Sequence, residues 1–301
     1  TFTLSKSVMN IAIYSVFFSP ETLAYIKTVI EYLESHQHNI TLVDRLKKYL
    51  GNEQDQYAYF SDDEILESNI DFLFSIGGDG TLLRSITVVR DSQIPIFGIN
   101  TGRLGFLTSL HRDVLAEGLD LFFKEKYTFI ERSLLEVNTK NPVSALEEIG
   151  FALNEVSINR KNTTSMLSIE AELDGKHLTT YWADGLIIST PTGSTGYSLS
   201  SGGPIVSPNS ACLILNPIAP HNINMRPLIV PDSTTIKLSV NGRDKNHLLS
   251  LDSRILTLEN GNDIYLKKAA FSIRTVQLEG AFFFDTLREK LFWGQDSRNT
   301  Q

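Results

Sequence analysis

The chain has 301 residues, of which 42% are hydrophobic and 21% charged, an ordinary globular composition that argues against intrinsic disorder. Its formal net charge of -8 disfavours nucleic acid as a partner, because nucleic-acid binding relies on clustered Lys and Arg that neutralise phosphates. The apolar runs are broken well before the ~18 residues that a membrane-spanning helix needs, so no membrane contact is expected.

The N-terminal region and the cysteine content bear on the cellular compartment. No basic stretch followed by an apolar region and a small-residue cleavage site precedes Met9, which we expect to be the natural start. Cys212 is the single cysteine of the sequence, so an internal disulfide is ruled out and a reducing compartment fits. We therefore expect a cytoplasmic protein.

In the first third of the chain, short apolar segments alternate with helical patterns. Residues 11–14 predict a buried strand, and Leu23, Ile26 and Ile30 then recur at helical spacing. Three more apolar segments predict buried strands, at residues 40–43, 70–76 and 94–99. This alternation favours a parallel sheet with helices on both faces. The sequence therefore predicts an N-terminal α/β domain.

After about residue 112 the pattern changes to strands in which apolar and polar residues alternate. Residues 167–173 and 178–182 lie on either side of Asp174-Gly175, which predicts a β-hairpin. Further strands are predicted at residues 236–240, 248–251, 255–258 and 264–266. The C-terminal domain is therefore expected to be β-rich.

The last apolar pattern predicts a helix over residues 282–292, with Phe283, Leu287 and Leu291 on one face. This segment is expected to return to the N-terminal domain. The predicted organisation is an α/β domain at residues 9–110, completed by residues 274–297, and a β-rich domain at residues 111–273.

A glycine-rich loop, Gly77-Gly78-Asp79-Gly80-Thr81, lies between the apolar strand at 70–76 and a predicted helix at 82–89. Glycines there permit positive φ and a close approach to a ligand, and the free N–H groups of a helix start attract phosphate oxygens. Asp79 would then stand beside the phosphates. An ordinary turn, in which Gly permits the bend and Asp or Thr caps the helix, explains the same residues equally well.

Residues 184–203 form a second unusual segment, Asp-Gly-Leu-Ile-Ile-Ser-Thr-Pro-Thr-Gly-Ser-Thr-Gly-Tyr-Ser-Leu-Ser-Ser-Gly-Gly. Its hydroxyls, exposed amides and one aromatic side chain, Tyr197, suit a ligand that carries ribose, amide and base edges. A flexible Ser/Gly linker is the alternative. The apolar strand at 186–188 and the rigid Pro191 disfavour that alternative.

Together these segments resemble the NAD kinase family, in the same order and over most of the chain. Residues 77–81 look like the phosphoryl-transfer loop of the family, and residues 100–107, Asn-Thr-Gly-Arg-Leu-Gly-Phe-Leu, look like its next motif. Asn154-Glu155 resembles its Asn-Glu pair, and residues 184–200 resemble its long NAD-binding segment. Four ordered matches are far more specific than one.

Further along the chain, Pro220-His221 and Arg226-Pro227-Leu228 resemble stretches of the same family, although a purely structural role for His221 stays open. The sequence departs from the family at two places. Gly196 stands where Ala is more frequent, and Asp252-Ser253 stands where Asp-Gly is usual.

The resemblance implies transfer of the γ-phosphoryl group of ATP to the 2′-hydroxyl of the adenosine ribose of NAD, giving NADP. Asp79 would accept the hydroxyl proton. The residues implied to bind NAD are Asp79, Gly80, Asn154, Glu155, Asp184, Thr195, Gly196, Tyr197 and Ser200. Those implied to bind the phosphates of ATP are Gly77, Gly78, Gly80, Thr81 and Arg84.

The resemblance also implies Mg²⁺ bound mainly through the nucleotide phosphates, and no metal cage built from protein ligands is expected. It further implies NAD bound between the two domains of a homodimer or homotetramer, in which a neighbouring subunit completes the NAD site.

Two other functions remain open. A lipid or diacylglycerol-type kinase resembles this chain in the loop at 77–81 and in a β-rich second domain, but such kinases lack the segment at 184–203. A non-catalytic dinucleotide-binding protein on the same scaffold would bind NAD without turning over ATP.

Overall fold

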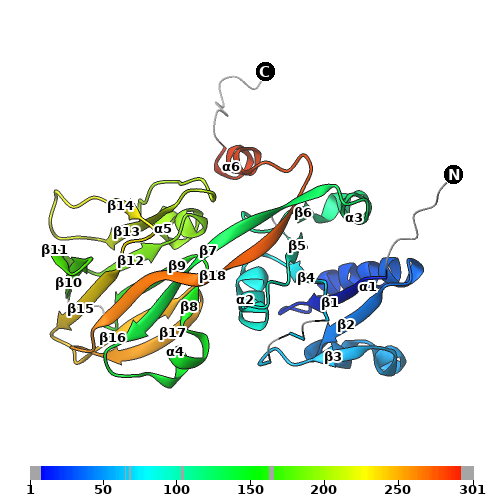
Figure 1. Ribbon diagram of the computed structural model, residues 1–301, viewed down its shortest axis with the longest axis horizontal. Helices are drawn as coiled ribbons and strands as arrows, with labels where there is room; N and C mark the ends of the chain where they lie inside the picture. The colour runs from blue at the N-terminus through cyan, green and yellow to red at the C-terminus, as the bar shows by residue number, and fades with distance from the viewer. Residues whose placement is uncertain (1–7, 65, 68, 103–104, 163–165, 293–301) are drawn as a thin grey trace, which may run out of the picture. The chain divides into compact units, whose positions relative to one another are not determined.

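The computed structural model describes residues 8–64, 66–67, 69–102, 105–162 and 166–292 (Figure 1). The chain forms two compact units. Unit 1 comprises Thr1–Ile130 together with Ile273–Gln301, and unit 2 comprises Glu131–Ser272. No helix in these described ranges is long and apolar enough to cross a membrane.

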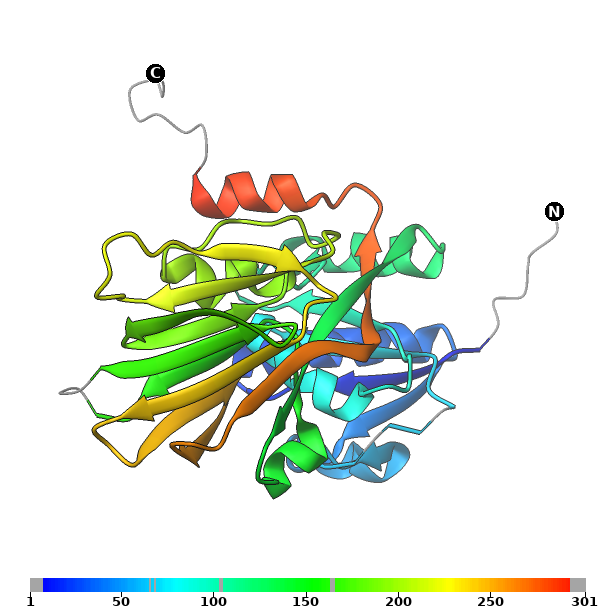
Figure 2. The same cartoon turned by 60° about the vertical axis from the view of Figure 1, so that its left-hand side comes forward.

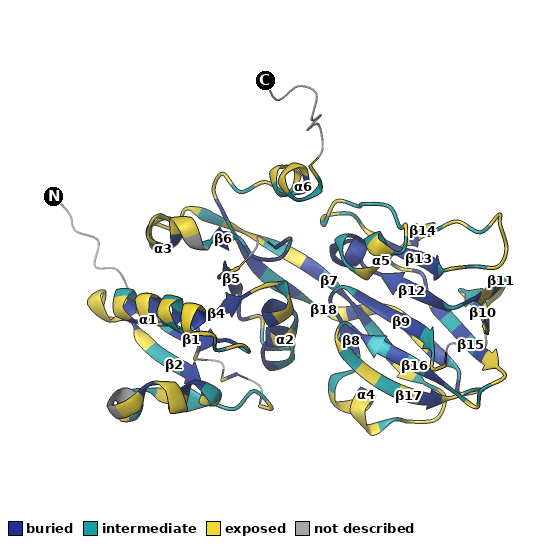
Figure 3. Ribbon diagram, turned by 180° about the vertical axis from the view of Figure 1, so that it is seen from behind, coloured by how far each residue is buried: buried dark blue, intermediate teal, exposed yellow. Residues whose placement is uncertain are grey.

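Unit 1 is built on a parallel sheet with the order β3-β2-β1-β4-β5, and both β6 and the end of β18 also pair with β5. The strands are β1 (Asn10–Tyr14), β2 (Asn39–Val43), β3 (Ala58–Phe60), β4 (Phe72–Gly77), β5 (Ile96–Asn100), β6 (Leu110–His111) and β18 (Ile264–Leu278). Every residue of β4 and β5 is buried (Figure 3). Such two-sided burial explains why these strands are continuous apolar runs in the sequence. The predicted α/β domain is confirmed.

The helices of unit 1 begin where the sequence provides a start. Ser19 caps the first helix by accepting a hydrogen bond from the Thr22 amide, and Pro20 occupies its first turn. That helix buries Ile26 and Leu33 against the sheet. The α-helices are α1 (Pro20–Ser35), α2 (Asp79–Val89), α3 (Leu115–Phe123) and α6 (Phe283–Leu291), and the 3-10 helices are η1 (Asp44–Tyr49), η2 (Gly51–Gln56) and η3 (Arg112–Val114).

Helix α3, which the sequence analysis did not predict, explains why unit 1 extends to Ile130 and not only to residue 110. Phe122 of α3 packs edge-on against Phe74, with 5.2 Å between ring centroids, and stacks on Phe97 at 4.8 Å. These aromatic contacts with the sheet tie residues 111–130 to unit 1.

The C-terminal segment returns to unit 1, as predicted. Thr275 of β18 pairs with Ile96 of β5, and Phe283 of α6 lies 6.4 Å from the Phe106 ring. Leu287 is the buried residue of α6. The last five residues of the predicted returning segment, 293–297, lie outside the described residues.

Unit 2 contains two sheets. The first has the order β11-β10-β15-β18 with β7 and β8 alongside, and the second, antiparallel throughout, has the order β14-β13-β12-β9-β16-β17 (Figure 2). The strands are β7 (Tyr127–Thr139), β8 (Phe151–Ala152), β9 (Glu155–Arg160), β10 (Leu167–Leu173), β11 (Lys176–Ala183), β12 (Gly185–Ser189), β13 (Cys212–Ile218), β14 (Leu228–Pro231), β15 (Ile236–Gly242), β16 (Asn246–Leu251) and β17 (Arg254–Glu259). The helical segments are α4 (Ser144–Ile149), η4 (Thr192–Thr195) and α5 (Tyr197–Ser200).

The core of unit 2 combines the inward rows of both sheets. Ile169 and Leu238 come from the first sheet, and Ile158, Ile188 and Leu249 come from the second. Alternation of buried and more exposed residues along β10 and β15 matches the period of two that the sequence displays. The predicted hairpin around Asp174-Gly175 is confirmed as β10 and β11, and so is the β-rich C-terminal domain.

Candidate active site

The loop at 77–81 connects β4 to α2 at the carboxyl end of the parallel sheet of unit 1. Gly77 has φ +154°, and a Cβ on it would lie 2.2 Å from the Thr81 hydroxyl oxygen. Only glycine therefore fits there. Gly78 is the N-cap of α2, and the first amides of a helix have no carbonyl one turn earlier to bond to. This is the place where an open α/β sheet binds ligands, and where a helix start binds phosphate.

Asp79 is the first residue of α2, and its carboxylate bonds to a neighbouring loop. Oδ2 accepts a hydrogen bond from the Phe106 amide at 2.7 Å, and Oδ1 accepts one from the Leu107 amide at 3.1 Å. No side chain within the described residues caps α2, so the helix-cap interpretation of Asp79 does not describe this structure. The half-buried carboxylate instead connects the predicted phosphoryl-transfer loop at 77–81 with the motif at 100–107.

Because Gly105 has no side chain, it leaves the space that the Asp79 carboxylate occupies. A Cβ on Gly105 would lie 1.7 Å from Asp79 Oδ1 and 2.5 Å from Asp79 Cγ. Gly105 belongs to the motif at 100–107, whose sequence alone does not reveal this contact. The space beside its Cα is where the carboxylate sits.

The side chain of Asn100 at the end of β5 shapes the same loop from within. Its Nδ2 donates to the Thr108 hydroxyl at 3.0 Å, and its Oδ1 accepts from the Gly102 amide at 2.7 Å. Gly77 and Asn100 are register partners in the sheet. The loops that follow β4 and β5 therefore begin side by side, although residues 103–104 of the second motif lie outside the described residues.

The remaining predicted phosphate ligands differ in exposure. Gly78, Gly80 and Arg84 are exposed, whereas Thr81 is buried. The Thr81 amide donates a hydrogen bond to the Gly78 carbonyl at 2.9 Å. The structure thus leaves the backbone of Gly80 and the guanidinium of Arg84 accessible on the first turns of α2, while Thr81 serves the packing under Gly77.

In unit 2, Asn154 and Glu155 lie where β8 leads into β9. Asn154 Oδ1 and Glu155 Oε2 are buried and have no hydrogen-bond partner in the part of the chain that the structure describes. Buried polar atoms are almost always paired, so two such acceptors next to each other need an explanation. A ligand with hydroxyl donors is the explanation that fits their chemistry.

The pKa of Glu155 is raised to about 7, first by burial and second by the charge of Asp252. The backbone amide of Tyr197 acts in the opposite direction and partly offsets the rise. Glu155 is only 8% exposed. At a pH above this value the buried carboxylate is ionised, and it can then accept charge-assisted hydrogen bonds that water does not supply.

The segment at 184–203 is ordered as strand and helical turns, which excludes the flexible-linker interpretation. The Thr190 hydroxyl donates to the Leu153 carbonyl at 2.6 Å, and the Thr190 amide donates to the Asn154 carbonyl at 2.9 Å. A Cβ on Gly193 would lie 2.0 Å from the Asn154 carbonyl oxygen. The Asn-Glu pair and the segment after β12 therefore pack directly together.

Four predicted NAD ligands follow in the same segment. Tyr197, at 41% exposure, and Ser200 are exposed, while the Thr195 hydroxyl donates to the Thr192 carbonyl at 3.3 Å. A Cβ on Gly196 would lie 3.0 Å from Glu155 Oε2. An alanine at this position would crowd the carboxylate, so this departure from the family pattern gives Glu155 additional room.

Asp184 lies away from the other predicted ligands of unit 2. It precedes β12, and Ser189 at the other end of that strand is the register partner of Glu155. Five residues of strand correspond to about 17 Å. The Asp184 carboxylate instead forms an ion pair with Arg160 at 2.9 Å. Within one chain, unit 2 does not bring Asp184 to Asn154 and Glu155.

Near that end of unit 2, an open cavity of about 570 Å³ is lined by Arg160, Trp182, His221 and Arg243, among others. The exposed His221 is held through its amide, which donates to the Trp182 carbonyl at 2.8 Å. The geometry of the chain gives His221 no contact with Asn154 or Glu155.

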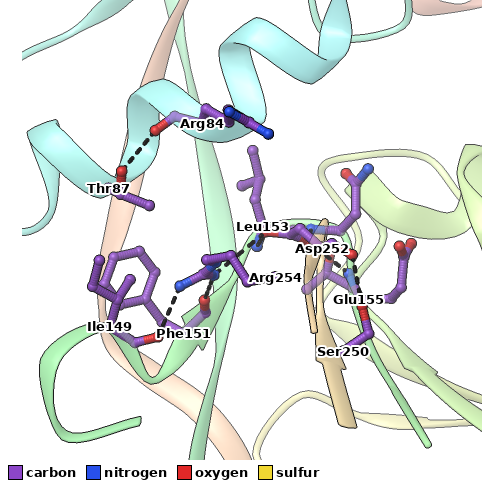
Figure 4. Close-up of polar contacts among 11 residues, drawn as sticks. Arg84, Thr87, Ile149, Phe151, Leu153, Glu155, Ser250, Asp252 and Arg254 are labelled. Atoms are coloured by element: carbon purple, nitrogen blue, oxygen red, sulfur yellow. Dashed lines mark hydrogen bonds and ion pairs between the residues drawn. The ribbon is translucent and has the colours of Figure 1, made fainter. Parts of the chain in front are cut away.

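The turn between β16 and β17 holds the Asn-Glu pair, and its role could not be read from the sequence. Asp252 accepts hydrogen bonds from the consecutive amides of Leu153, Asn154 and Glu155, at 2.9, 2.8 and 3.2 Å (Figure 4). In the sequence, Asp252-Ser253 was noted only as a departure from the family pattern, between strands predicted at 248–251 and 255–258.

The described residues contain no group of three His, Cys, Asp or Glu side chains arranged to hold a metal ion. Unit 1 has a glycine loop at a helix start beside a carboxylate, and unit 2 has a cluster of buried oxygen acceptors. These features are typical of a phosphotransferase that acts on a hydroxyl group. Residues 19–127 match the ATP-NAD kinase N-terminal domain, and residues 153–278 match the ATP-NAD kinase C-terminal domain. The chain belongs to the NAD kinase family.

Known relatives agree along nearly the whole length. The chain is 48% identical to the NAD kinase of Christiangramia forsetii, over 97% of this chain and 100% of that protein. Among solved structures, it is similar to yeast NADH kinase complexed with NADH, with TM-score 0.84, 25% identity and coverage of 98% of this chain and 90% of that chain. It is also similar to an NAD kinase from Archaeoglobus fulgidus in complex with ATP, with TM-score 0.73, 26% identity and coverage of 93% and 99%. Both domains and the fold are those of NAD kinases, which sets the lipid-kinase alternative aside.

Proposed function

We propose that this enzyme transfers the γ-phosphoryl group of ATP to the 2′-hydroxyl of the adenosine ribose of NAD, with Asp79 as general base. The observation that carries the proposal is the Asp79 carboxylate, which two backbone amides orient at the start of a phosphate-binding helix. Each carboxylate oxygen has two lone pairs, so accepting one amide leaves a second position for the proton of the attacking hydroxyl. Orientation by fixed donors is what a general base needs.

The step conserves atoms and charge. The O–H bond of the 2′-hydroxyl breaks as its proton passes to Asp79, the hydroxyl oxygen bonds to the γ-phosphorus, and ADP leaves with the bridging oxygen. The exposed backbone of Gly78 and Gly80 and the Arg84 side chain stabilise the phosphates. Phosphoryl transfer depends mainly on such positioning and charge neutralisation.

NAD is proposed to be held in unit 2 by the oxygens that lack partners. The acceptors Asn154 Oδ1 and Glu155 Oε2 suit ribose hydroxyls, which are donors. Exposed Tyr197 and Ser200 suit the base and the remaining polar edges, with Thr195 and Gly196 shaping the backbone between them. Burial of Glu155 strengthens each hydrogen bond that it accepts.

Magnesium is the expected metal. Mg²⁺ is commonly held by one or two carboxylates together with substrate phosphates, keeping several waters. Such an ion would be carried in with the nucleotide. Bound there, the ion would supply neutralisation of the phosphate charge.

Self-association into a dimer or tetramer is also proposed. Asp184 is expected to bind NAD by family resemblance, yet about 17 Å of strand separates it from the register partner of Glu155. A neighbouring subunit that contributes its Asp184 to the site would reconcile the two. The single cysteine, Cys212, fits a cytoplasmic enzyme.

The decisive assay mixes NAD, ATP and Mg²⁺ with the purified protein and measures NADP with an NADP-specific dehydrogenase. We expect NADP and ADP in equal amounts, and no NADP when either substrate is left out. NAD binding without NADP formation would support the non-catalytic alternative, and phosphorylation at another hydroxyl would reject the proposed geometry.

A further inference from the structure

The turn between β16 and β17 is held in an unusual backbone conformation. Asp252 has φ +52°, in the left-handed region that most non-glycine residues avoid but that Asp adopts more often, above all in hairpin turns. Its amide donates to the Glu155 carbonyl at 2.9 Å, and the Ser250 hydroxyl donates to the Asp252 carbonyl at 3.0 Å. The turn is thus tied to the first residue of β9.

The carboxylate of Asp252 makes the main connection. It is 2% exposed, and its two oxygens accept from three consecutive amides, those of Leu153, Asn154 and Glu155. Because three consecutive amides point at one carboxylate, the direction of the backbone through residues 153–155 is fixed. This stretch of backbone carries the side chains of Asn154 and Glu155, which are predicted NAD ligands.

Arg254 holds the chain just before Leu153, at residues 149–151. Its Nη1 donates to the Ile149 carbonyl at 2.8 Å, its Nη2 donates to the Phe151 carbonyl, and the guanidinium lies 3.9 Å from Asp252 Oδ2 (Figure 4). Asp252 therefore binds the donors of the segment, and Arg254 binds its acceptors. Asp252 in the turn and Arg254 at the start of β17 together hold the backbone from residue 149 to residue 155.

We propose that Asp252, supported by Arg254, is a positioning residue for the acceptor site: it holds the backbone so that Asn154 and Glu155 present their unpaired oxygens to NAD. This inference rests on the proposed NAD site. The turn touches the backbone of the pair and not the atoms that would meet the ligand, so its role is preorganisation.

The charge of Asp252 has a second consequence for Glu155. After burial, the Asp252 charge is the next cause that raises the pKa of Glu155 to about 7. Tyr197 from α5 faces Glu155 through its backbone amide, and Arg254 from β17 acts on Asp252. Burial raises the pKa of Asp252 as well, but three amides and Arg254 favour its ionised form. Removing the Asp252 charge should therefore lower the pKa of Glu155.

The test is Asp252→Asn, which keeps the size but turns an NH₂ group toward at least one amide donor. We expect the KM for NAD to rise at least tenfold at pH 8, while the KM for ATP stays within twofold. The acid inflection of kcat/KM for NAD, set by ionisation of Glu155, should move to lower pH. A residue that served only stability would not shift that inflection.

Asp174→Asn is the matched control. Asp174 also opens a hairpin turn with positive φ, at +49°, and its carboxylate accepts from the Thr235 amide and hydroxyl, each at 2.9 Å. It contacts none of the proposed ligands through these bonds. Its KM for NAD and its pH profile should match the wild type.

An unchanged KM for NAD and an unchanged inflection in Asp252→Asn would overturn the inference. If that variant does not fold, Arg254→Lys replaces it, since Lys keeps the charge but cannot bond both carbonyls. It should raise the KM for NAD at least threefold, and an unchanged KM would equally overturn the inference. Glu155→Gln distinguishes failure of the proposed NAD site from failure of the role of the turn. If Glu155→Gln leaves NAD affinity unchanged, the proposed site itself is wrong. If Glu155→Gln lowers NAD affinity but Asp252→Asn does not, only the role of the turn is rejected.

Discussion

Replacing Gly105 by Ala adds one methyl group at the point where the Asp79 carboxylate lies. The new Cβ would be 1.7 Å from Oδ1 and 2.5 Å from Cγ, so the side chain of Asp79 has to move. The nearest atoms that this Cβ would meet all belong to Asp79. The effect of the substitution should come from Asp79 alone.

The displaced carboxylate loses its hydrogen bonds from the Phe106 and Leu107 amides, at 2.7 and 3.1 Å. A hydrogen bond to a charged group contributes about 1.5–3 kcal/mol, and water replaces part of this at a half-buried carboxylate. We therefore expect a stability loss of about 2 kcal/mol by urea unfolding. Loss of an oriented general base should lower kcat by about 10² to 10⁴.

The control is Gly102→Ala in the same loop, where Asn100 Oδ1, at 3.9 Å, is the one atom of the described residues that the Cβ would meet. It should leave kcat within twofold. Adding Gly105→Ala to Asp79→Ala should cause no further loss of stability, because the clashing group has gone. Wild-type turnover in Gly105→Ala would refute the placement of Asp79 beside Gly105.

Further predictions concern unit 2 and assembly. Glu155→Gln should weaken NAD binding, measured by calorimetry, by about 1.5–3 kcal/mol. Because the folded-state pKa of Glu155 is raised from 4.5 to about 7, the free energy of unfolding should fall as pH rises between these two values, by up to about 3 kcal/mol. Thermal melts should therefore show the Gln variant more stable than wild type at pH 8, with the difference gone below the unfolded-state pKa. Replacing Thr195 and Tyr197 together by Ala should raise the KM for NAD, and an unchanged KM would place the base elsewhere. Light scattering should show a dimer or tetramer at assay concentration, and Asp184→Ala should weaken NAD binding; a fully active monomer would remove the need for a neighbour.

Much of the fold could be predicted because its elements have strong periodic patterns. The buried strands β4 and β5 are continuous apolar runs, and the β10–β11 hairpin has alternating strands around Asp174-Gly175. Helix α3 was missed, since its burial depends on aromatic contacts between Phe122 and a sheet distant in sequence. Helix α2 begins at Asp79 and not at Leu82, because glycines and polar residues that look like loop form its first turn.

Candidate site residues could be proposed from the sequence where a motif names the residue type, and not where a tertiary contact defines the role. The loop at 77–81 and the Asn154-Glu155 pair were proposed from their sequence and order. The space that Gly105 leaves for Asp79 and the three amides bound by Asp252 depend on tertiary neighbours. No pattern in a single sequence reports such contacts.

The most direct test of the account is turnover of Asp79→Asn. Asn keeps the size of the side chain and one acceptor for the Phe106 or Leu107 amide, but it cannot accept the hydroxyl proton. Steady-state NADP formation should fall by about 10² to 10⁴, while calorimetry should give an NAD affinity close to that of the wild type. Near-normal turnover of the folded variant would contradict the assignment of Asp79 as the general base.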